Sequence, residues 1–265
     1  MPLLHTDALI MRRRPTRDAD ALVTLFGEKG GKIVASTKSV MKTTSRLAGI
    51  TQPFNQLHAI LYAKSEDQEI WTLTQASLIR SFSAIQTDLN RMAFASCLVE
   101  WLDILSGEFE SNQPVWQLLI ASMERWERQE PGMEDLFYCQ WQLLRDAGFE
   151  PQIGTCLRCR SVEASSWKYS VKEGGVLCRK CPGEGLTLSH ASMLSLRKLA
   201  ASPQPPSWQI AIEQKNEIHL LLDRHLEYHG GMASKASRFL DKLLEKGKTG
   251  VSNGSILREE KECRL

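Results

Sequence analysis

The sequence has no apolar run that approaches the roughly 18 residues needed to cross a membrane as a helix. Its start also lacks a basic segment ahead of an apolar one, because Arg12, Arg13 and Arg14 follow the first apolar stretch, so we expect no signal peptide. No nucleophile–base pair and no tuned cluster of carboxylates stands out. We therefore expect a cytoplasmic protein that contacts no membrane and is not an enzyme.

Cysteine is present, but its context excludes a disulfide framework. Cytoplasmic cysteines are kept reduced, so the seven found here are not expected to form disulfides. Four of them form two CxxC pairs, which indicates a metal site. Cys97 and Cys139 lie on apolar helix faces and are expected in the core, and Cys263 is expected to be a free thiol in a polar tail.

The net charge of +2 hides an uneven distribution along the chain. Residues 10–50 hold nine Lys/Arg and three Asp/Glu, a net charge of +6. Residues 81–150 hold four Lys/Arg and twelve Asp/Glu, a net charge of −8. The basic segment is a candidate for contact with an anionic partner such as nucleic acid, whereas the acidic segment does not suit a phosphate backbone.

Residues 1–80 have the pattern of a small β-barrel. Runs rich in β-branched, aromatic and aliphatic residues predict five short strands, at 3–11, 21–26, 32–37, 56–63 and 70–79. The segment Gly27-Glu28-Lys29-Gly30-Gly31 supplies the positive φ that a tight hairpin needs between the second and third strands. Five strands in about 80 residues predict an OB-fold, with an SH3-like barrel as the alternative.

After residue 81 the apolar period becomes that of helices. Phe94, Leu98, Trp101, Leu102 and Leu105 fall on one helical face. Further helices are predicted at 115–126, 134–147, 188–201, 212–228 and 234–246. Gly148 is expected to cap the helix before it in a left-handed conformation. Residues 247–265 are polar without an apolar period, and we expect a disordered tail.

The cysteine-rich region at 154–185 has the pattern of a zinc ribbon. Cys156-x2-Cys159 and Cys178-x2-Cys181 are separated by eighteen residues, in which 167–171 and 174–177 predict a two-stranded hairpin. Four thiolates fill the tetrahedral shell of Zn²⁺ and leave no open position, so we predict one structural zinc ion. Redox-active CxxC pairs are the alternative, but these usually open a helix in a βαβ unit, and the pattern shows none.

Eight basic residues at strand ends and in loops are the candidates for contact with phosphates. They are Arg12, Arg13, Arg14, Lys29, Lys32, Lys38, Lys42 and Arg46. The loops of an OB barrel commonly bind nucleic acid through such side chains, with little sequence readout. A solvated basic surface without a partner is the alternative. The aromatic residues nearby, Phe26, Phe54, Tyr62 and Trp71, are expected mostly in the core.

The chain is thus predicted to be an α+β multi-domain protein. Its parts are an OB-fold DNA-binding domain (1–80), a helical domain (81–153 and 186–246) with an inserted zinc-ribbon-like module (154–185), and the tail (247–265). His225-Leu226-Glu227-Tyr228-His229 does not match HExxH, since its glutamate is in the wrong place for a metalloprotease base. We expect it to be a solvated or partly buried helix end.

The order of these parts, with several short strings, resembles the RecO recombination-mediator family. Residues 12–15 with 18–26 are similar to the family's first hairpin, and 31–33 with Lys38 and 42–47 to its basic third strand and loop. Similar strings continue through the later barrel, the cysteine module and the last helices, at 52–54, 71–76, 143–151, 174–178, 226–229 and 237–240. The resemblance covers about residues 1–245, but Ser36-Thr37-Lys38 stands where the family has a Gly-Ala-Arg-like string.

The resemblance implies a DNA repair protein that binds single- and double-stranded DNA and anneals complementary strands. With RecR, such a protein helps to load RecA on strands coated by single-stranded DNA-binding protein. Implied partners are therefore RecR and the C-terminal tail of single-stranded DNA-binding protein, with RecF and RecA contacted indirectly, in the cytoplasm at the nucleoid. Some family members lack the four cysteines, which implies that zinc supports the fold.

Two other classes of function stay open. The first is a protein-interaction scaffold of repair complexes in which DNA binding is weak or secondary. The second is a zinc hydrolase or nuclease, which would need an open metal position that four thiolates do not leave.

Overall fold

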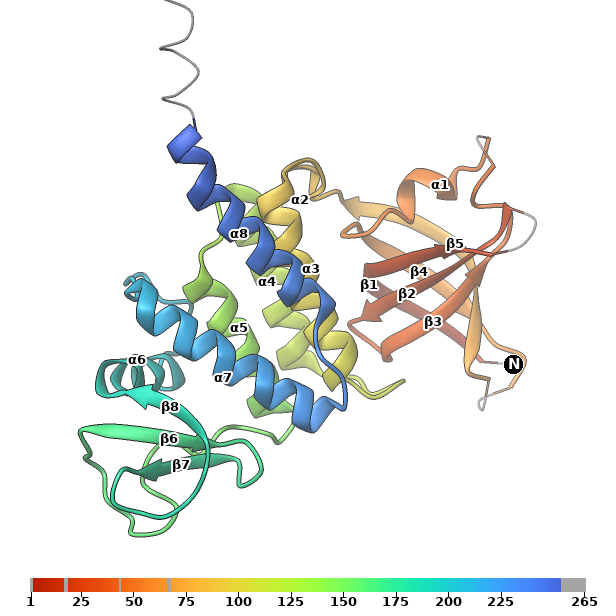
Figure 1. The fold of residues 1–265 in the computed structure, drawn as a ribbon. Coiled ribbons are helices and arrows are strands. Elements are labelled where there is room, and N and C mark those ends of the chain that lie inside the picture. Colours follow the sequence, from red (N-terminus) through yellow and green to blue (C-terminus); the bar gives the residue numbers. More distant parts are fainter. Residues whose placement is uncertain (1, 17–18, 43, 66–67, 254–265) are drawn as a thin grey trace, which may run out of the picture.

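The computed structural model describes residues 2–16, 19–42, 44–65 and 68–253. A β-barrel packs against a bundle of helices, and a small three-stranded sheet lies on the side of the bundle away from the barrel (Figure 1). No helix in this described part is long and apolar enough to span a bilayer.

The barrel closes in the strand order β1-β2-β3-β5-β4. Its strands are β1 (Leu3–Pro15), β2 (Ala21–Gly27), β3 (Gly31–Thr37), β4 (Gln56–Tyr62) and β5 (Ile70–Arg80). β3 and β5 pair in parallel, whereas the other neighbours, including β4 with β1, are antiparallel. This order confirms the OB-fold.

Alternation along the strands produces two apolar faces. Ala8, Ile10, Val23 and Leu25 point into the barrel, where they meet inward residues of the other three strands. On the outer face, Leu9, Met11 and Phe26 join the core of the helical bundle instead. The strands β1 and β2 are therefore buried on both faces, whereas the outer face of an isolated barrel would be exposed to solvent.

The hairpin between β2 and β3 confirms the role predicted for its glycines. Gly30 and Gly31 adopt φ values of 85° and 57°. A side chain at Gly31 would also meet the carbonyl oxygen of Glu110, because the loop after α3 runs directly past it. In that loop, the Phe109 amide donates to the Lys32 carbonyl at 3.1 Å, which extends the barrel wall beyond the three residue pairs of β3 and β5.

The helical bundle is built around α3. Its helices are α2 (Ser83–Thr87), α3 (Leu89–Leu105), α4 (Gln113–Arg128), α5 (Met133–Asp146), α6 (His190–Ala200), α7 (Ile212–Gly230) and α8 (Lys235–Asn253). Asp88, Asn112 and Ser189 cap three of them by accepting a bond from a first-turn amide. Gly148 takes the predicted left-handed conformation at φ 78°.

Several features of the structure differ from the sequence prediction. Leu186–Ser189 form a strand, β8, so the helix predicted from Leu188 begins at His190. Pairing of Leu188 with Trp167 overrides the helical pattern there. The short helices α1 (Leu47–Ile50) and α2 were not predicted, and β1 continues to Pro15, past its predicted end at residue 11. Helix α8 continues to Asn253, past the predicted end at residue 246, as elongation of an anchored helix costs little. Residues 254–265, with Cys263, lie outside the described part.

Asp103 on α3 joins the barrel to the bundle. Its carboxylate lies 3.2 Å from Arg12 Nη1 and 3.4 Å from Lys32 Nζ, and its carbonyl oxygen accepts a bond from the same Nζ at 2.8 Å. The Lys32 side chain is only 15% exposed. Removal of Asp103 would therefore leave a largely buried cation without its counter-charge.

We expect Asp103→Ala to lower the free energy of unfolding by about 1–2 kcal/mol, less than for a fully buried pair because Arg12 is partly exposed. Urea denaturation measures this change. The control is Glu124→Ala, which removes the partner of Arg80 and Arg128 in a more exposed ion pair. Equal destabilisation by the two variants would show that Asp103 has no special role at the junction.

Candidate metal centre and basic surface

The structure brings the four predicted cysteine ligands together. The sulfur atoms of Cys156, Cys159, Cys178 and Cys181 all lie within 4.8 Å of one another. The sulfurs of Cys159 and Cys178 are 3.6 Å apart, close to the roughly 3.8 Å that a tetrahedral site with Zn–S bonds of about 2.3 Å requires. The cluster is therefore compatible with a bound metal ion.

Backbone amides around the cluster favour the ionised form of Cys156. Cys156 and Cys159 precede β6 (Ser166–Ser170), and Cys178 ends β7 (Gly175–Cys178). Burial opposes ionisation, but amides of Cys159, Cys178 and Arg158 directed at the sulfur lower the pKa of Cys156 to about 6. Hydrogen bonds with Cys159 and the other neighbouring thiols raise the pKa of Cys181 to about 12. Four thiolates at this spacing thus need a cation to offset their charge.

Arg197 on α6 holds the cysteine module against the bundle. Its guanidinium donates three bonds to backbone carbonyls of the module's first arm, those of Ile153, Gly154 and Val162, each at 3.0 Å. The same group lies 5.2 Å from the ring centre of Trp167 on β6. The module is therefore fixed by directed polar contacts as well as by its apolar strands.

His225 on α7 is a second link to the module. Residues 225–229 form a partly buried helix end, as one of the two predicted alternatives stated, but His225 itself is fully buried. The side chain is 1% exposed, not solvated. The Tyr169 hydroxyl lies 2.6 Å from His225 Nδ1, and the Phe149 carbonyl lies 2.7 Å from Nε2. Since a carbonyl can only accept, Nε2 carries the proton and Nδ1 accepts from Tyr169. Burial lowers the pKa of His225 to about 4, so the ring is neutral near pH 7.

The eight basic candidates do not form one surface. Arg14, Lys38, Lys42 and Arg46 are exposed at the end of the barrel where β1 finishes and β2 begins. The loop that carries Lys38 and Lys42 is fixed there by bonds from the amides of Ser39 and Met41 to Asp20 and Ala19. Lys29 is exposed at the opposite end of β2, roughly 20 Å away at the rise of a strand.

The other three candidates make polar contacts with other parts of the protein. Arg12 and Lys32 pair with Asp103. Arg13 Nη1 donates to the Ala48 carbonyl at 2.7 Å and so fixes α1 to the barrel. Phe26, Phe54 and Trp71 are buried, which confirms their expected place in the core. Cys97 and Cys139 are buried as well, and burial raises the pKa of Cys139 to about 12, so this thiol stays neutral.

Sequence reasoning missed one group of polar residues between α7 and α8. His219, Asp223 and Asp241 place one nitrogen and two carboxylate oxygens within 4.8 Å of one another. The spacing of His219 and Asp223, one helical turn apart, was a signal available in the sequence. Asp241 comes from a different helix, and no local pattern points to it.

Comparison with known proteins gives a consistent result over most of the chain. The model "Recombination protein O N terminal" matches residues 1–82, and "Recombination protein O C terminal" matches residues 86–238. A DNA repair protein RecO of Symbiobacterium thermophilum is 28% identical over 252 residues, which cover 92% of this chain and 98% of that protein. Proteins of the same name from Anaeromyxobacter sp. (strain K) and Bacillus pumilus are 29% and 26% identical, over 92% and 91% of this chain and 98% and 94% of their own lengths.

We expect Cys178→Ser to abolish tetrathiolate metal binding, to lower the melting temperature and to lower solubility, because the module loses the ligand that ends β7. Absorption of the cobalt-loaded protein measures the first effect, since sulfur-to-cobalt charge transfer reports thiolate ligands. Cys139→Ala is the control, because this cysteine is buried outside the cluster. An unchanged spectrum and melting temperature in Cys178→Ser would show that Cys178 is not a ligand.

We expect the module to loosen in acid through His225. The pKa of about 4 in the folded protein lies below the usual value of about 6.5, so the unfolded chain binds more protons between these values. The contribution of His225 to stability is complete above about pH 6.5 and falls towards pH 4, by up to about 1.4 kcal/mol per pH unit. Melting curves from pH 7 to pH 5 should show a smaller decline in His225→Gln than in the wild type, whereas the exposed His190→Gln should behave as the wild type.

Proposed function

Because the chain belongs to the recombination protein O (RecO) family of DNA repair proteins, we propose that it is a recombination mediator. In this role it binds single- and double-stranded DNA, anneals complementary strands and, with RecR, helps to load RecA on strands coated by single-stranded DNA-binding protein. It does this without making or breaking covalent bonds, in the cytoplasm at the nucleoid. RecF and RecA are contacted indirectly.

One observation carries the DNA-binding part of this proposal. Arg14, Lys38, Lys42 and Arg46 are all exposed on one end of an OB barrel. Four cations, one at the end of β1 and three between β3 and α1, match a phosphate backbone, which is bound mainly by neutralisation of its charge. Of the eight basic candidates, these four make the first contact with DNA, with Arg13 beside them. Lys29 contacts a DNA strand that continues along the barrel to its other end. Arg12 and Lys32 contact DNA only if their ion pairs with Asp103 break.

The cysteine cluster supports a structural role for one Zn²⁺. Cys156, Cys159, Cys178 and Cys181 would hold the ion, and the sulfur spacing and the amides directed at Cys156 fit a closed tetrathiolate site. Such a site offers no position for substrate. The zinc module (154–185) then serves to order the helical domain (81–153 and 186–246), and the barrel (1–80) is the DNA-binding domain.

A scaffold of repair complexes with secondary DNA binding is the second candidate. It is favoured by Leu78 and Ile79 on β5, which are adjacent, apolar and each 47% exposed. Exposed apolar residues of this kind are common where one protein contacts another. In addition, helices cover part of the outer face of β1 and β2, near the face by which OB-folds bind oligonucleotides.

Fluorescence anisotropy of a labelled single-stranded oligonucleotide at several salt concentrations tests the first candidate. The variant combines Arg14→Ala, Lys38→Ala and Lys42→Ala. If each of these side chains neutralises one phosphate, the slope of log affinity against log salt should decrease by about 2, at about 0.7 for each contact. Annealing of complementary strands should slow in parallel.

A variant with the same change of charge elsewhere provides the control. Arg128→Ala, Lys172→Ala and Lys242→Ala remove three exposed cations outside the barrel and should leave the slope unchanged. Equal loss in both variants would mean that only net charge matters. An unchanged slope in the barrel variant, with partner binding lost on Leu78→Ser and Ile79→Ser, would favour the scaffold.

A further inference from the structure

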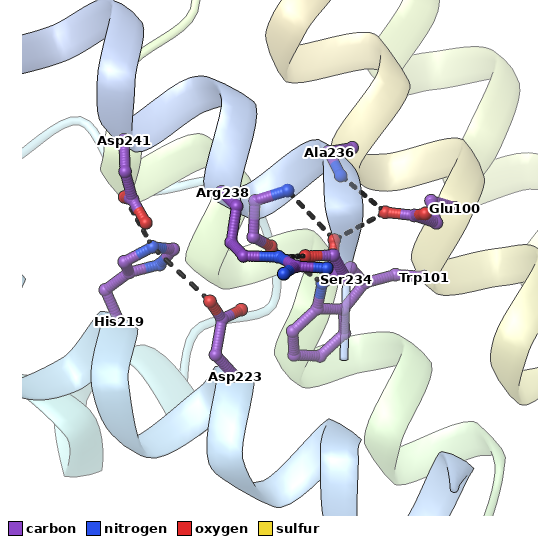
Figure 2. A network of polar contacts seen from close by, with 9 residues as sticks. Glu100, Trp101, His219, Asp223, Ser234, Ala236, Arg238 and Asp241 are labelled. Carbon is purple, nitrogen blue, oxygen red and sulfur yellow. Dashed lines mark hydrogen bonds and ion pairs between the residues drawn. The ribbon is translucent and has the colours of Figure 1, made fainter. Parts of the chain in front are cut away.

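His219, Asp223 and Asp241 form a compact group where α8 passes α7. His219 Nε2 lies 2.8 Å from Asp241 Oδ1 and 3.6 Å from Asp223 Oδ2. Figure 2 shows the imidazole between the two carboxylates, one from its own helix and one from α8. Because His219 and Asp223 are four residues apart, they project from the same face of α7. Three possible ligand atoms from two helices therefore converge on one point.

The protein uses only part of the hydrogen-bonding capacity of this group: Nε2 of His219 faces Asp241, and the Asp223 carboxyl group interacts with Ser237. Both ring nitrogens of His219 and Oδ1 of Asp223 are buried and lack a directed hydrogen bond among the described residues. Nε2 also lies at ion-pair distance from Asp241, whereas Nδ1 of His219 and Oδ1 of Asp223 have no partner of either kind among the described residues. A buried polar atom without a hydrogen-bond partner destabilises the fold. The clustering of these groups, with unpartnered buried atoms among them, points to a ligand that accepts electron pairs from a nitrogen and from carboxylates together.

The charge around the group points in the same direction. Glu100 on α3, Asp223 and Asp241 lie close enough for their charges to act on the same buried thiol, that of Cys97. Glu100 is occupied as the cap of α8, where it accepts bonds from the Ser234 hydroxyl and the Ala236 amide at 2.6 and 2.7 Å. Arg238 belongs to the network in Figure 2, but its Nε donates to the Ser234 carbonyl. A protonated His219 alone would leave an excess of negative charge.

We propose that His219, Asp223 and Asp241 bind a divalent transition-metal ion, separate from the four-cysteine cluster. One imidazole and two carboxylates are ligands that suit Mn²⁺, Fe²⁺, Co²⁺ or Zn²⁺. The donor atoms lie within 4.8 Å of one another, so small side-chain adjustments bring them to the bond lengths of about 2.0–2.2 Å typical of such ions. Asp241 is 43% exposed, which leaves an entry path and room for water ligands.

The position of the ion gives it a structural effect on the DNA-binding part. Helix α8 packs along α3, and its first turns reach the barrel junction. Lys235 and Phe239 of α8 line a cleft there with Met11 and Arg12 of β1. An ion shared by α7 and α8 would fix α8 in place and hold this wall of the cleft. Metal binding would thereby rigidify the junction next to the basic end of β1.

Electron paramagnetic resonance with Mn²⁺ as the probe tests the proposal on the full chain, with zinc retained in the cysteine cluster. Mn²⁺ prefers oxygen and nitrogen ligands over thiolates, so it reports this group selectively. We expect the free Mn²⁺ signal to fall in a saturable way to one ion bound per chain, and added Zn²⁺ to compete. His219→Ala and Asp241→Asn should each weaken binding by about tenfold or more.

His58→Ala is the matched control. His58 Nδ1 also lies 2.8 Å from a carboxylate, that of Asp7, but this pair has no third ligand in the described structure. His58→Ala should leave Mn²⁺ binding unchanged. Cys178→Ser should also leave it unchanged, because this substitution affects only the cysteine cluster. Mn²⁺ should also raise the melting temperature of the wild type but not of Asp241→Asn.

Two outcomes would overturn the proposal. One is the absence of saturable Mn²⁺ binding and of Zn²⁺ binding beyond the cysteine cluster in the wild type. The other is binding of undiminished strength in both His219→Ala and Asp241→Asn. Either result would leave the group as an ion pair between α7 and α8. DNA binding enters neither readout, so the result is independent of the proposed function.

Discussion

The contact between the Asp103 carboxylate and two cations of the barrel determines which surfaces of the barrel are buried and which stay exposed. Arg12 and Lys32 come from β1 and β3, so one side chain of α3 spans the outer face of the sheet. Around this contact, Leu9, Met11 and Phe26 enter the core of the helical bundle. A barrel face that could have been open to solvent becomes an internal wall. The barrel end that carries Arg14, Lys38 and Lys42 remains the exposed basic surface.

The parts of the structure that follow local patterns could be predicted from the sequence. The alternation of apolar residues places all five strands, because the same period buries one face of each in the barrel. The spacing of the cysteines identifies the cluster, because two CxxC turns flank a hairpin. The strand β8 could not be predicted in this way, since Leu186–Ser189 is extended only through pairing with β6, about twenty positions earlier.

Whether a charged group is free to bind a partner depends on contacts with residues far away in the sequence. Nothing near Arg12 or Lys32 shows that an aspartate about seventy to ninety positions later occupies them. Likewise, the burial of His225 depends on Tyr169 and Phe149, which come from other elements. The same limit applies to the group at His219, since Asp241 reaches it from another helix. Residue type and spacing thus predicted the kinds of site, and tertiary packing decided which side chains serve them.

The loop after α3 completes the barrel, and this affects any attempt to separate the two halves of the protein. Phe109 bonds to the backbone of Lys32 and places its ring 5.5 Å from that of Trp71, beside the short parallel seam of β3 and β5. A fragment cut after β5 would lose this closing segment and present an open strand edge with an apolar ring next to it. Such edges promote association between chains. The edge of β3 at Lys32 is therefore covered only after residues 106–110 have been synthesised, which couples the folding of the barrel to that of the helical bundle.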